Sequence, residues 1–219
     1  EGVEPDLLFR GCAVDRPPRH AAFLPFPDET VVCLSPETFY ERDGDRIVCR
    51  PMKGTAAPDA APESLTEDPK SRAENLMIAD MVRADLGKIA RPGTVRTTRL
   101  FAIDRLPTVL QMSTEIEARS SAGLVERFRA LFPCASVTGA PRTMAMRRLA
   151  KWETGPRGLY CGAVGYVGPG VDRFGVAIRT AVVDREGRGT YGVGSGIVWD
   201  SDPADEWAEC ARKADVLAG

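Results

Sequence analysis

Two glutamates and a lysine near the end of the chain are spaced so that they share one face of a helix. Glu206, Glu209 and Lys213 follow one another at intervals of three and four residues, the repeat of a helix face. Two carboxylates one turn apart can share a hard cation such as Mg²⁺, which prefers oxygen ligands. The same spacing also fits a solvated face with a Glu–Lys pair, worth roughly a few tenths of a kcal/mol. Spacing alone favours this second interpretation.

A third carboxylate, Glu74, lies in a long helix predicted over 69–87, with Asp68 as its N-cap and Pro69 in its first turn. We expect the buried stripe of this helix to consist of Leu76, Ala79, Val82 and Leu86. Glu74 opens an otherwise apolar row, so its carboxylate could meet the two C-terminal glutamates across a cleft. A glutamate in the first turn also favours the helix dipole, and the spacing leaves both interpretations open.

Lys53 directly follows a predicted strand and is one of only five lysines in the chain. A desolvated lysine near a carboxylate such as that of Glu37 could act as a nucleophile once it is deprotonated. Taken alone, the position fits an exposed loop lysine better.

Three further features could bind an anionic ligand. The segment 138–141 presents backbone N–H groups at a predicted helix start, and the glycines of 192–196 let the backbone approach a ligand closely. A strand rather than a helix is expected after the second segment, which argues against a dinucleotide loop. Arg179 lies on an apolar strand and needs an anionic partner: either a substrate carboxylate or a buried salt bridge.

The elements that must position these residues predict an α+β fold, because strands in consecutive hairpins alternate with separate helices. Strands are expected over 20–26, 31–35, 38–41, 46–50, 95–103, 109–116, 162–167, 174–183 and 191–199, with a surface loop over 55–68. Further helices are expected over 122–132, after Pro141, and from Pro203 to Leu217. The helix over 122–132 should bury Leu124, Val125, Phe128 and Leu131.

Composition narrows the function classes. The 219 residues suit one domain, 1–219, and a net charge of −2 gives no electrostatic footprint for nucleic acid or an anionic membrane. No apolar run reaches the roughly twenty residues of a spanning helix, and the polar first residues do not suggest a signal peptide, so we expect a cytoplasmic protein. With a single histidine and six cysteines that form no CxxC pair, zinc and histidine-base catalysis are excluded and reduced thiols are expected.

The order of the motifs resembles the chorismate-binding enzymes from about residue 19 to the end. The motifs are SPE at 35–37, RPMKGT at 50–55, RAENLMI at 72–78, SVTGAP at 136–141, YCGAVGY at 160–166, AIRT at 177–180, GSGIV at 194–198 and the segment 200–213. The family includes component I of anthranilate synthase and of aminodeoxychorismate synthase, and the isochorismate and salicylate synthases. The resemblance implies two large, mostly antiparallel sheets packed face to face with flanking helices, in a chain that begins partway into the family domain.

By this resemblance, three glutamates surround Mg²⁺, and a further set of residues holds chorismate, which is a dianion. The metal positions are Glu74, Glu206 and Glu209. The substrate-binding positions are Gly54, Thr55, Ser136, Thr138, Tyr166, Arg179, Gly194, Gly196 and Lys213.

Lys53 is the decisive position within the family, because aminodeoxychorismate synthases carry lysine there and anthranilate synthases usually carry alanine. The resemblance implies that Lys53 attacks ring carbon 2 of chorismate and that Glu37 moves the protons. Ammonia from a glutamine amidotransferase then adds at carbon 4, giving 4-amino-4-deoxychorismate, the precursor of para-aminobenzoate and folate. Gln111 stands where anthranilate synthases have histidine, and Arg142 replaces a usual lysine. The alternatives are anthranilate synthase or another chorismate enzyme, and a truncated chain that binds without turnover.

Overall fold

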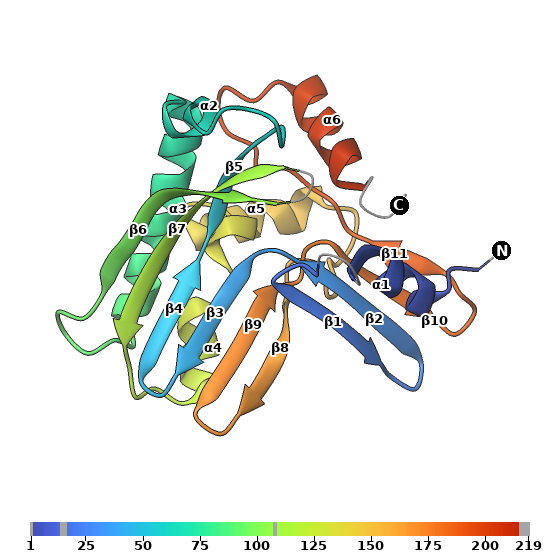
Figure 1. The fold of residues 1–219 in the computed structure, drawn as a ribbon, viewed down its shortest axis with the longest axis horizontal. Coiled ribbons are helices and arrows are strands. Elements are labelled where there is room, and N and C mark those ends of the chain that lie inside the picture. Colours follow the sequence, from blue (N-terminus) through green and yellow to red (C-terminus); the bar gives the residue numbers. More distant parts are fainter. Residues whose placement is uncertain (1, 14–16, 107–108, 215–219) are drawn as a thin grey trace. The chain divides into compact units, whose positions relative to one another are not determined.

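Two antiparallel sheets and their helices are present in the computed structural model, which describes residues 2–13, 17–106 and 109–214 (Figure 1). The chain divides into two units. The first consists of Glu1–Pro36, Arg157–Gly165 and Gly175–Gly219, and the second of Glu37–Pro156 and Tyr166–Phe174. The predicted α+β class with antiparallel sheets is confirmed.

The first unit is built on a four-stranded sheet with the strand order β1-β2-β10-β11. Its strands are β1 (His20–Pro25), β2 (Glu29–Ser35), β10 (Thr180–Asp184) and β11 (Gly189–Tyr191). Alternate side chains of a strand point to opposite faces. One face therefore buries Val32, Leu34, Ala181 and Val183 with Ala13 of helix α1 (Pro5–Ala13), and the other buries Val31 and Cys33 with Val164 and Ala177.

The strand predicted over 174–183 is wrong, because the chain leaves one sheet and enters another within it. Strand β9 (Val171–Val176) ends before Arg179, whose φ of 48° lies in the left-handed region and interrupts extended backbone. The strand predicted over 191–199 is also wrong, because β11 ends at Tyr191 and 192–199 is not a strand.

Helix α6 (Pro203–Ala214) belongs to the first unit and begins as the sequence predicts. The carboxylate of Asp202 accepts hydrogen bonds from the backbone N–H groups of Ala204 and Asp205, at 2.9 and 3.1 Å, which caps the helix. The predicted end at Leu217 lies outside the described residues.

The second unit is built around a seven-stranded sheet with the order β5-β7-β4-β3-β9-β8, in which β6 also pairs with β7. The remaining strands are β3 (Thr38–Asp43), β4 (Arg46–Arg50), β5 (Met52–Ala56), β6 (Arg96–Arg105), β7 (Leu110–Arg119) and β8 (Ala163–Gly168). Strand β6 pairs with β7 from end to end, so β4 and β5 follow one another along the opposite edge of β7. Lys53 therefore lies on a continuation of the β3–β4 hairpin.

Helix α3 (Pro69–Gly87) has the predicted bounds, and the carboxylate of Asp68 accepts from the backbone N–H of Ser71 at 2.7 Å. The predicted buried stripe is partly wrong, because Leu76 is 53% exposed. The residues that the helix buries are Asn75, Ile78, Ala79, Val82, Asp85 and Leu86. Two polar side chains are thus included in the buried face, and both have partners on other elements.

The buried face predicted for helix α4 (Leu124–Leu131) is confirmed at Leu131 and wrong at its first two residues. Leu124 and Val125 are exposed, whereas Arg127 is buried together with Ala130 and Leu131. Phe128 joins an aromatic cluster with Phe39, Tyr40, Phe132 and Phe174, whose neighbouring ring centroids lie 5.1 to 6.2 Å apart. The buried arginine explains the difference, because its charge meets a buried carboxylate on β9.

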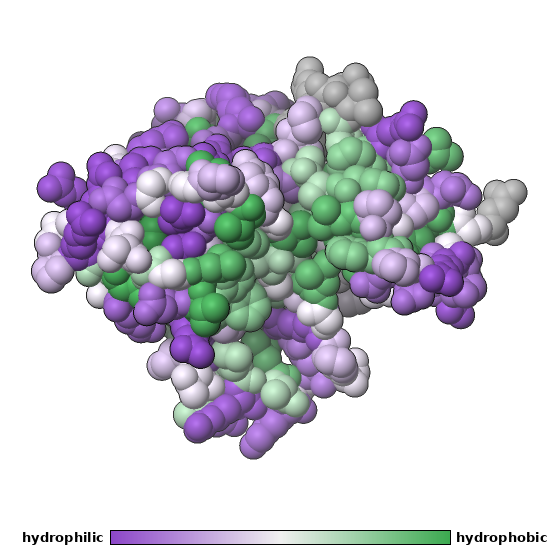
Figure 2. All heavy atoms as spheres, turned by 90° about the horizontal axis from the view of Figure 1, so that it is seen from below, coloured by the Kyte–Doolittle hydropathy of each residue, from purple (hydrophilic) through white to green (hydrophobic). Residues whose placement is uncertain are grey.

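Helices α2 (Glu63–Thr66) and α5 (Arg142–Trp152) complete the second unit. Part of the segment expected to be a loop is thus helical, and Leu65 of α2 is buried. All three tryptophans, in contrast, are exposed: Trp152 by 73%, Trp199 by 99% and Trp207 by 77%. On the face that Figure 2 views, green hydrophobic residues lie between purple hydrophilic ones. Among the residues described, no helix has the length and apolar character needed to cross a membrane.

Asp172 is the fully buried carboxylate that holds β3, β9 and α4 together. It accepts hydrogen bonds from the Arg127 guanidinium at 2.6 Å, the Arg42 guanidinium at 2.9 and 3.0 Å, and the Tyr40 hydroxyl at 3.2 Å. Burial by itself would raise the pKa of Asp172, but the hydrogen bonds and the two positive charges outweigh burial and lower it. The charged network therefore stabilises the ionised form.

We expect Asp172→Asn to lower the free energy of unfolding by about 3–5 kcal/mol, because it leaves buried guanidinium charge uncompensated. Asp43→Asn is the matched control, since it breaks an exposed pair with Arg173 and should cost no more than about 1 kcal/mol. Chemical denaturation measures both. Equal losses in the two variants would contradict the assigned role of Asp172.

The same network predicts a pH dependence. Because the folded pKa of Asp172 lies below its ordinary value, its contribution is complete above about pH 4 and is lost as the pH falls through the folded pKa. Unfolding curves from pH 7 to pH 2 should therefore show a shallower acid decline for Asp172→Asn than for the unmodified chain. Identical declines would mean that this carboxylate contributes nothing to acid sensitivity.

Candidate functional site

The predicted site residues form two groups, one in each unit. The second unit holds Glu37, Lys53, Gly54, Thr55, Glu74, Ser136, Thr138 and Tyr166, and the first holds Arg179, Gly194, Gly196, Glu206, Glu209 and Lys213. The second unit carries the predicted nucleophile and proton carrier, and the first carries two of the predicted metal ligands and the charged substrate-binding residues.

Lys53 lies in a β-bulge of β5. The pairing partner of Met52 on β7 is Ser113. The partner of Thr55 is Gln111, so β5 holds one residue more than β7 over this interval. A bulge bends its strand and changes the direction in which side chains point. The bulge therefore determines the direction of the Lys53 side chain.

Gly54 is required at the bulge because of its backbone and its neighbours. Its φ of 90° lies in the left-handed region, which favours glycine. A Cβ at this position would lie 3.0 Å from Cε of Met112 and 3.1 Å from Cβ of Ser71. A larger residue would therefore displace β5 from β7 and α3.

Two amide side chains hold the bulge in place. Asn75 of α3 donates to the carbonyl oxygen of Lys53 at 3.3 Å, and Gln111 of β7 donates to the carbonyl oxygen of Gly54 at 2.7 Å. Sequence reasoning missed Asn75 and used Gln111 only to separate subgroups. The available signal was composition, because these are the only asparagine and the only glutamine in the chain.

Glu74 precedes Asn75 in α3 and is half-buried. Because Asn75 contacts the Lys53 backbone, the helix turn that carries Glu74 lies against the bulge that carries Lys53. The structure thus brings the predicted nucleophile and one of the three predicted metal ligands onto neighbouring elements.

Glu37 is 4% exposed and lies just before β3. Thr38 pairs with Arg50, which places Glu37 beside the junction of β4 and β5, one strand away from the Lys53 segment. Glu37 also affects Cys134: burial chiefly raises the pKa of that thiol, and the charge of Glu37 adds to the effect, bringing it to about 12. The predicted proton carrier is therefore buried close to the segment that contains Ser136.

Ser136 lies in the short 3₁₀ helix η1 (Ala135–Val137), and its hydroxyl lies 3.1 Å from the sulfur of Cys134. The Thr138 hydroxyl donates to the carbonyl oxygen of Cys134 at 3.0 Å. Both hydroxyls thus contact this segment itself, and the backbone N–H groups of Val137 and Thr138 donate to the carbonyl oxygens of Cys134 and Ala135.

Arg142, at the start of α5, anchors the same segment to α3. Its guanidinium forms a two-point ion pair with the buried carboxylate of Asp85, which also pairs with Lys88 at 2.7 Å. Arginine suits this contact because its planar fork matches a carboxylate. The family difference noted at position 142 is therefore a structural contact in this chain.

Tyr166, on β8, is 59% exposed. Its ring is therefore accessible to a ligand from the surface of the second unit.

Arg179 of the first unit is half-buried, and among the described residues its guanidinium has neither an ion-pair nor a hydrogen-bond partner. Burial lowers the pKa of this guanidinium, and the nearby Tyr191 opposes the shift. Of the two sequence interpretations, a buried salt bridge is absent from the described residues, so the arginine is left with positive charge to offer an anion.

Lys213 contributes a second cation to the first unit. Its ammonium group donates to the carbonyl oxygen of Gly194 at 2.8 Å and pairs with the carboxylate of Glu209 at 2.5 Å. The predicted glycine segment, which includes Gly196, is thereby tied to α6.

The close approach permitted by these glycines is made to Tyr160. A Cβ at Gly192 would lie 2.4 Å from Cγ of the Tyr160 ring, and one at Gly194 would lie 2.8 Å from its hydroxyl oxygen. Positions 192 and 194 must therefore be glycine to pack against this ring. This is a structural reason in addition to the close ligand approach that the sequence suggested.

Glu206 and Glu209 lie one turn apart on α6, as predicted. Glu206 is only 9% exposed, and its Oε1 accepts from the Ser201 hydroxyl at 2.6 Å. Two carboxylates fit the oxygen donors that Mg²⁺ prefers. Within the described ranges no group of three or more His, Cys, Asp or Glu residues is arranged to hold a metal ion, and Glu74 belongs to the other unit.

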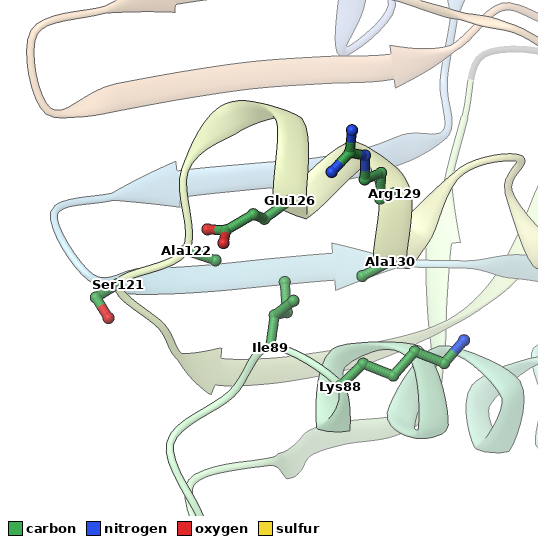
Figure 3. A pocket seen from close by; sticks show the side chains of 7 residues that line it. All are labelled: Lys88, Ile89, Ser121, Ala122, Glu126, Arg129 and Ala130. Carbon is green, nitrogen blue, oxygen red and sulfur yellow. The ribbon is translucent and has the colours of Figure 1, made fainter.

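A surface pocket of about 500 Å³ lies in the second unit between the end of α3 and α4 (Figure 3). Its lining consists of Lys88, Ile89, Ser121, Ala122, Glu126, Arg129 and Ala130. Glu126 accepts from the backbone N–H of Gly123 at 2.7 Å and so caps its own helix. None of the predicted site residues lines this pocket.

Comparisons with known proteins agree with the motif order. An aminodeoxychorismate synthase from Streptomyces griseus is 41% identical over 98% of this chain and 31% of its own length. An anthranilate synthase component 1 from Streptomyces coelicolor is 38% identical over 85% of this chain and 38% of its own length. The chain thus spans about a third of the length of these relatives.

A solved structure gives the same result for the fold. The anthranilate synthase component I of Streptococcus pneumoniae superposes with a TM-score of 0.90 at 28% identity, over 99% of this chain and 50% of that one. The family described as chorismate binding enzyme matches residues 2–219. Together with the ordered motifs and the two antiparallel sheets, this match shows that the chain belongs to the chorismate-binding enzyme family.

Proposed function

We propose that this chain carries the catalytic centre of a component I of aminodeoxychorismate synthase, which aminates chorismate at ring carbon 4. The observation that carries the proposal is Lys53 at a bulge held by two amide side chains, where a related enzyme that aminates carbon 2 usually has alanine. A relative named aminodeoxychorismate synthase, at 41% identity, supports the same subgroup.

The proposed chemistry proceeds in two displacements. The neutral amine of Lys53 forms a bond to ring carbon 2, both ring double bonds shift by one position, and the hydroxyl leaves carbon 4 as water with a proton from Glu37. Ammonia then forms a bond to carbon 4, both double bonds shift back, and the bond from carbon 2 to Lys53 breaks. The new ammonium group on carbon 4 returns a proton to Glu37. Chorismate and ammonia are thus converted into 4-amino-4-deoxychorismate and water.

Charge supports a dianionic substrate. Arg179 offers a half-buried guanidinium that has no described counter-charge, and such a group binds a carboxylate through two parallel hydrogen bonds. Lys213 is partly neutralised by Glu209 and orders the glycine segment. The remaining proposed contacts are the backbone of Gly54, Thr55 and the 136–138 segment, with Tyr166 at the surface of its unit.

Glu74, Glu206 and Glu209 are the residues that would hold Mg²⁺. The bound ion would offset the charge of a substrate carboxylate. The Ser201 hydroxyl donates to Oε1 of Glu206 and so orients this carboxylate.

The proposed partner is a glutamine amidotransferase that releases ammonia. A relative from Klebsiella aerogenes is named aminodeoxychorismate synthase component 1, and this name supports a second component for the present chain. The product would enter para-aminobenzoate and folate synthesis in the cytoplasm.

Anthranilate synthase component I is the second candidate, because relatives with that name are 33–38% identical. Lys53 and Gln111 favour the first candidate. The aminated carbon separates them, since anthranilate synthase gives the ortho amine and the proposed reaction gives the para isomer.

We expect Lys53→Ala to lower the rate of amination at carbon 4 by about 10³-fold or more, because the variant lacks the nucleophile. Chorismate binding should stay within about threefold, since the proposed carboxylate contacts remain. Turnover with excess ammonia and chorismate titration measure these two effects.

Lys151→Ala is the matched control, because Lys151 is an exposed lysine in the last turn of α5 in the same unit. Its activity should equal that of the unmodified chain. If Lys53→Ala forms aminodeoxychorismate at the parental rate, covalent catalysis by Lys53 is wrong.

For the metal, we expect Glu209→Gln to raise the Mg²⁺ concentration for half-maximal activity by about tenfold or more, because one charged oxygen ligand is lost. Glu186→Gln is the control in the same unit, since it breaks an exposed pair with Arg188, as Glu209→Gln breaks the pair with Lys213. An unchanged Mg²⁺ titration in Glu209→Gln would remove this residue from the metal site.

A further inference from the structure

The only asparagine and the only glutamine of the chain both bind the backbone at Lys53 and Gly54. They come from different elements, Asn75 from helix α3 and Gln111 from strand β7. A primary amide side chain is neutral and offers both donors and an acceptor, and both residues use both capacities here.

Asn75 bridges the two strands at the bulge. Its Nδ2 donates to the carbonyl oxygens of Lys53 and Met112, each at 3.3 Å, and these residues lie on β5 and β7. Its Oδ1 accepts from the Thr114 hydroxyl at 2.5 Å. With 1% of Asn75 exposed, its polar atoms are satisfied by protein groups rather than by water.

Gln111 holds the next two residues of β5. Its Nε2 donates to the carbonyl oxygen of Gly54 at 2.7 Å, and its Oε1 accepts from the Thr55 hydroxyl at 3.2 Å. Hydrogen bonds from Asn75 and Gln111 thus hold consecutive residues of the bulge.

We propose that Asn75 is a positioning residue for Lys53, with Gln111 as its second support, so that the two amides set the direction of the lysine side chain. The reactive role of Lys53 rests on the proposed function, whereas its orientation by Asn75 does not. The inference follows from the bulge: a bulge without regular pairing has several backbone arrangements, and hydrogen bonds to its carbonyls select one.

A purely structural role would predict a different outcome. Asn75 packs in a buried face, so its replacement lowers stability whether or not Lys53 needs an exact direction. The test therefore compares Asn75 with Thr114, which is also buried and which contacts Asn75 but not Lys53.

The decisive variants are Asn75→Asp, which keeps the acceptor for Thr114 and loses both donors, and Thr114→Val, which removes the hydroxyl and keeps the amide on Lys53. Thermal unfolding ranks their stability. Intact-mass spectra after mixing with chorismate and Mg²⁺, without ammonia, give the rate of adduct formation, and chorismate titration gives the affinity.

We expect Asn75→Asp to slow adduct formation by roughly 10- to 100-fold with the chorismate affinity within about threefold, because a displaced nucleophile loses its attack geometry. Thr114→Val should form the adduct at a rate within about threefold of the unmodified chain. We expect this even if its unfolding temperature falls as much as that of Asn75→Asp. If both variants slowed adduct formation equally, in proportion to their loss of unfolding temperature, the proposal would be overturned.

A second readout keeps the test independent of turnover. Acylation by a small amine-reactive ester, followed by peptide mass spectrometry, gives the labelling rate of Lys53 relative to Lys151 in the same molecule. Asn75→Asp should change this ratio at least about fivefold and Thr114→Val should not. An unmodified chain without any chorismate adduct would refute the proposed function, while the labelling ratio would still decide the role of Asn75.

Discussion

The rest of the candidate site depends on one local constraint, the bulge of β5 at Lys53 and Gly54. One extra residue on β5 releases backbone carbonyls from regular pairing with β7, and Asn75 and Gln111 bind those carbonyls. The constraint links three elements, because β5 and β7 carry the bulge and α3 supplies Asn75 with Glu74 beside it. Gly54, with its positive φ and its contacts to Met112 and Ser71, completes it.

Two buried carboxylates organise the framework around the bulge in the second unit. Asp172 accepts from Arg42, Arg127 and Tyr40, and Asp85 accepts from Arg142 and Lys88. The three arginine pairs join elements that are distant in sequence, and each of these arginines has a buried carboxylate partner. In the first unit Arg179 differs, because no described group balances its charge. Structural arginines and an arginine proposed to bind substrate are thus distinguished by their partners rather than by burial.

Local chemistry made some elements predictable from the sequence. Asp68-Pro69 and Asp202-Pro203 fix two helix starts through capping, and both are confirmed. The buried face of α4 was mispredicted because Arg127 turns inward to meet Asp172, 45 residues later. The contact of Asn75 with Lys53, 22 residues apart, has the same origin. Hydrophobic periodicity carries no information about such polar pairings, whereas the ordered motifs identified the family without them.

The proposed function requires that this chain direct ammonia to carbon 4 of chorismate. The most direct measurement is the identity of the product that the unmodified chain forms from chorismate, Mg²⁺ and excess ammonia, resolved by chromatography and mass spectrometry against authentic standards. The account predicts 4-amino-4-deoxychorismate and no anthranilate. Formation of anthranilate, or no aminated product while chorismate still binds, would contradict it.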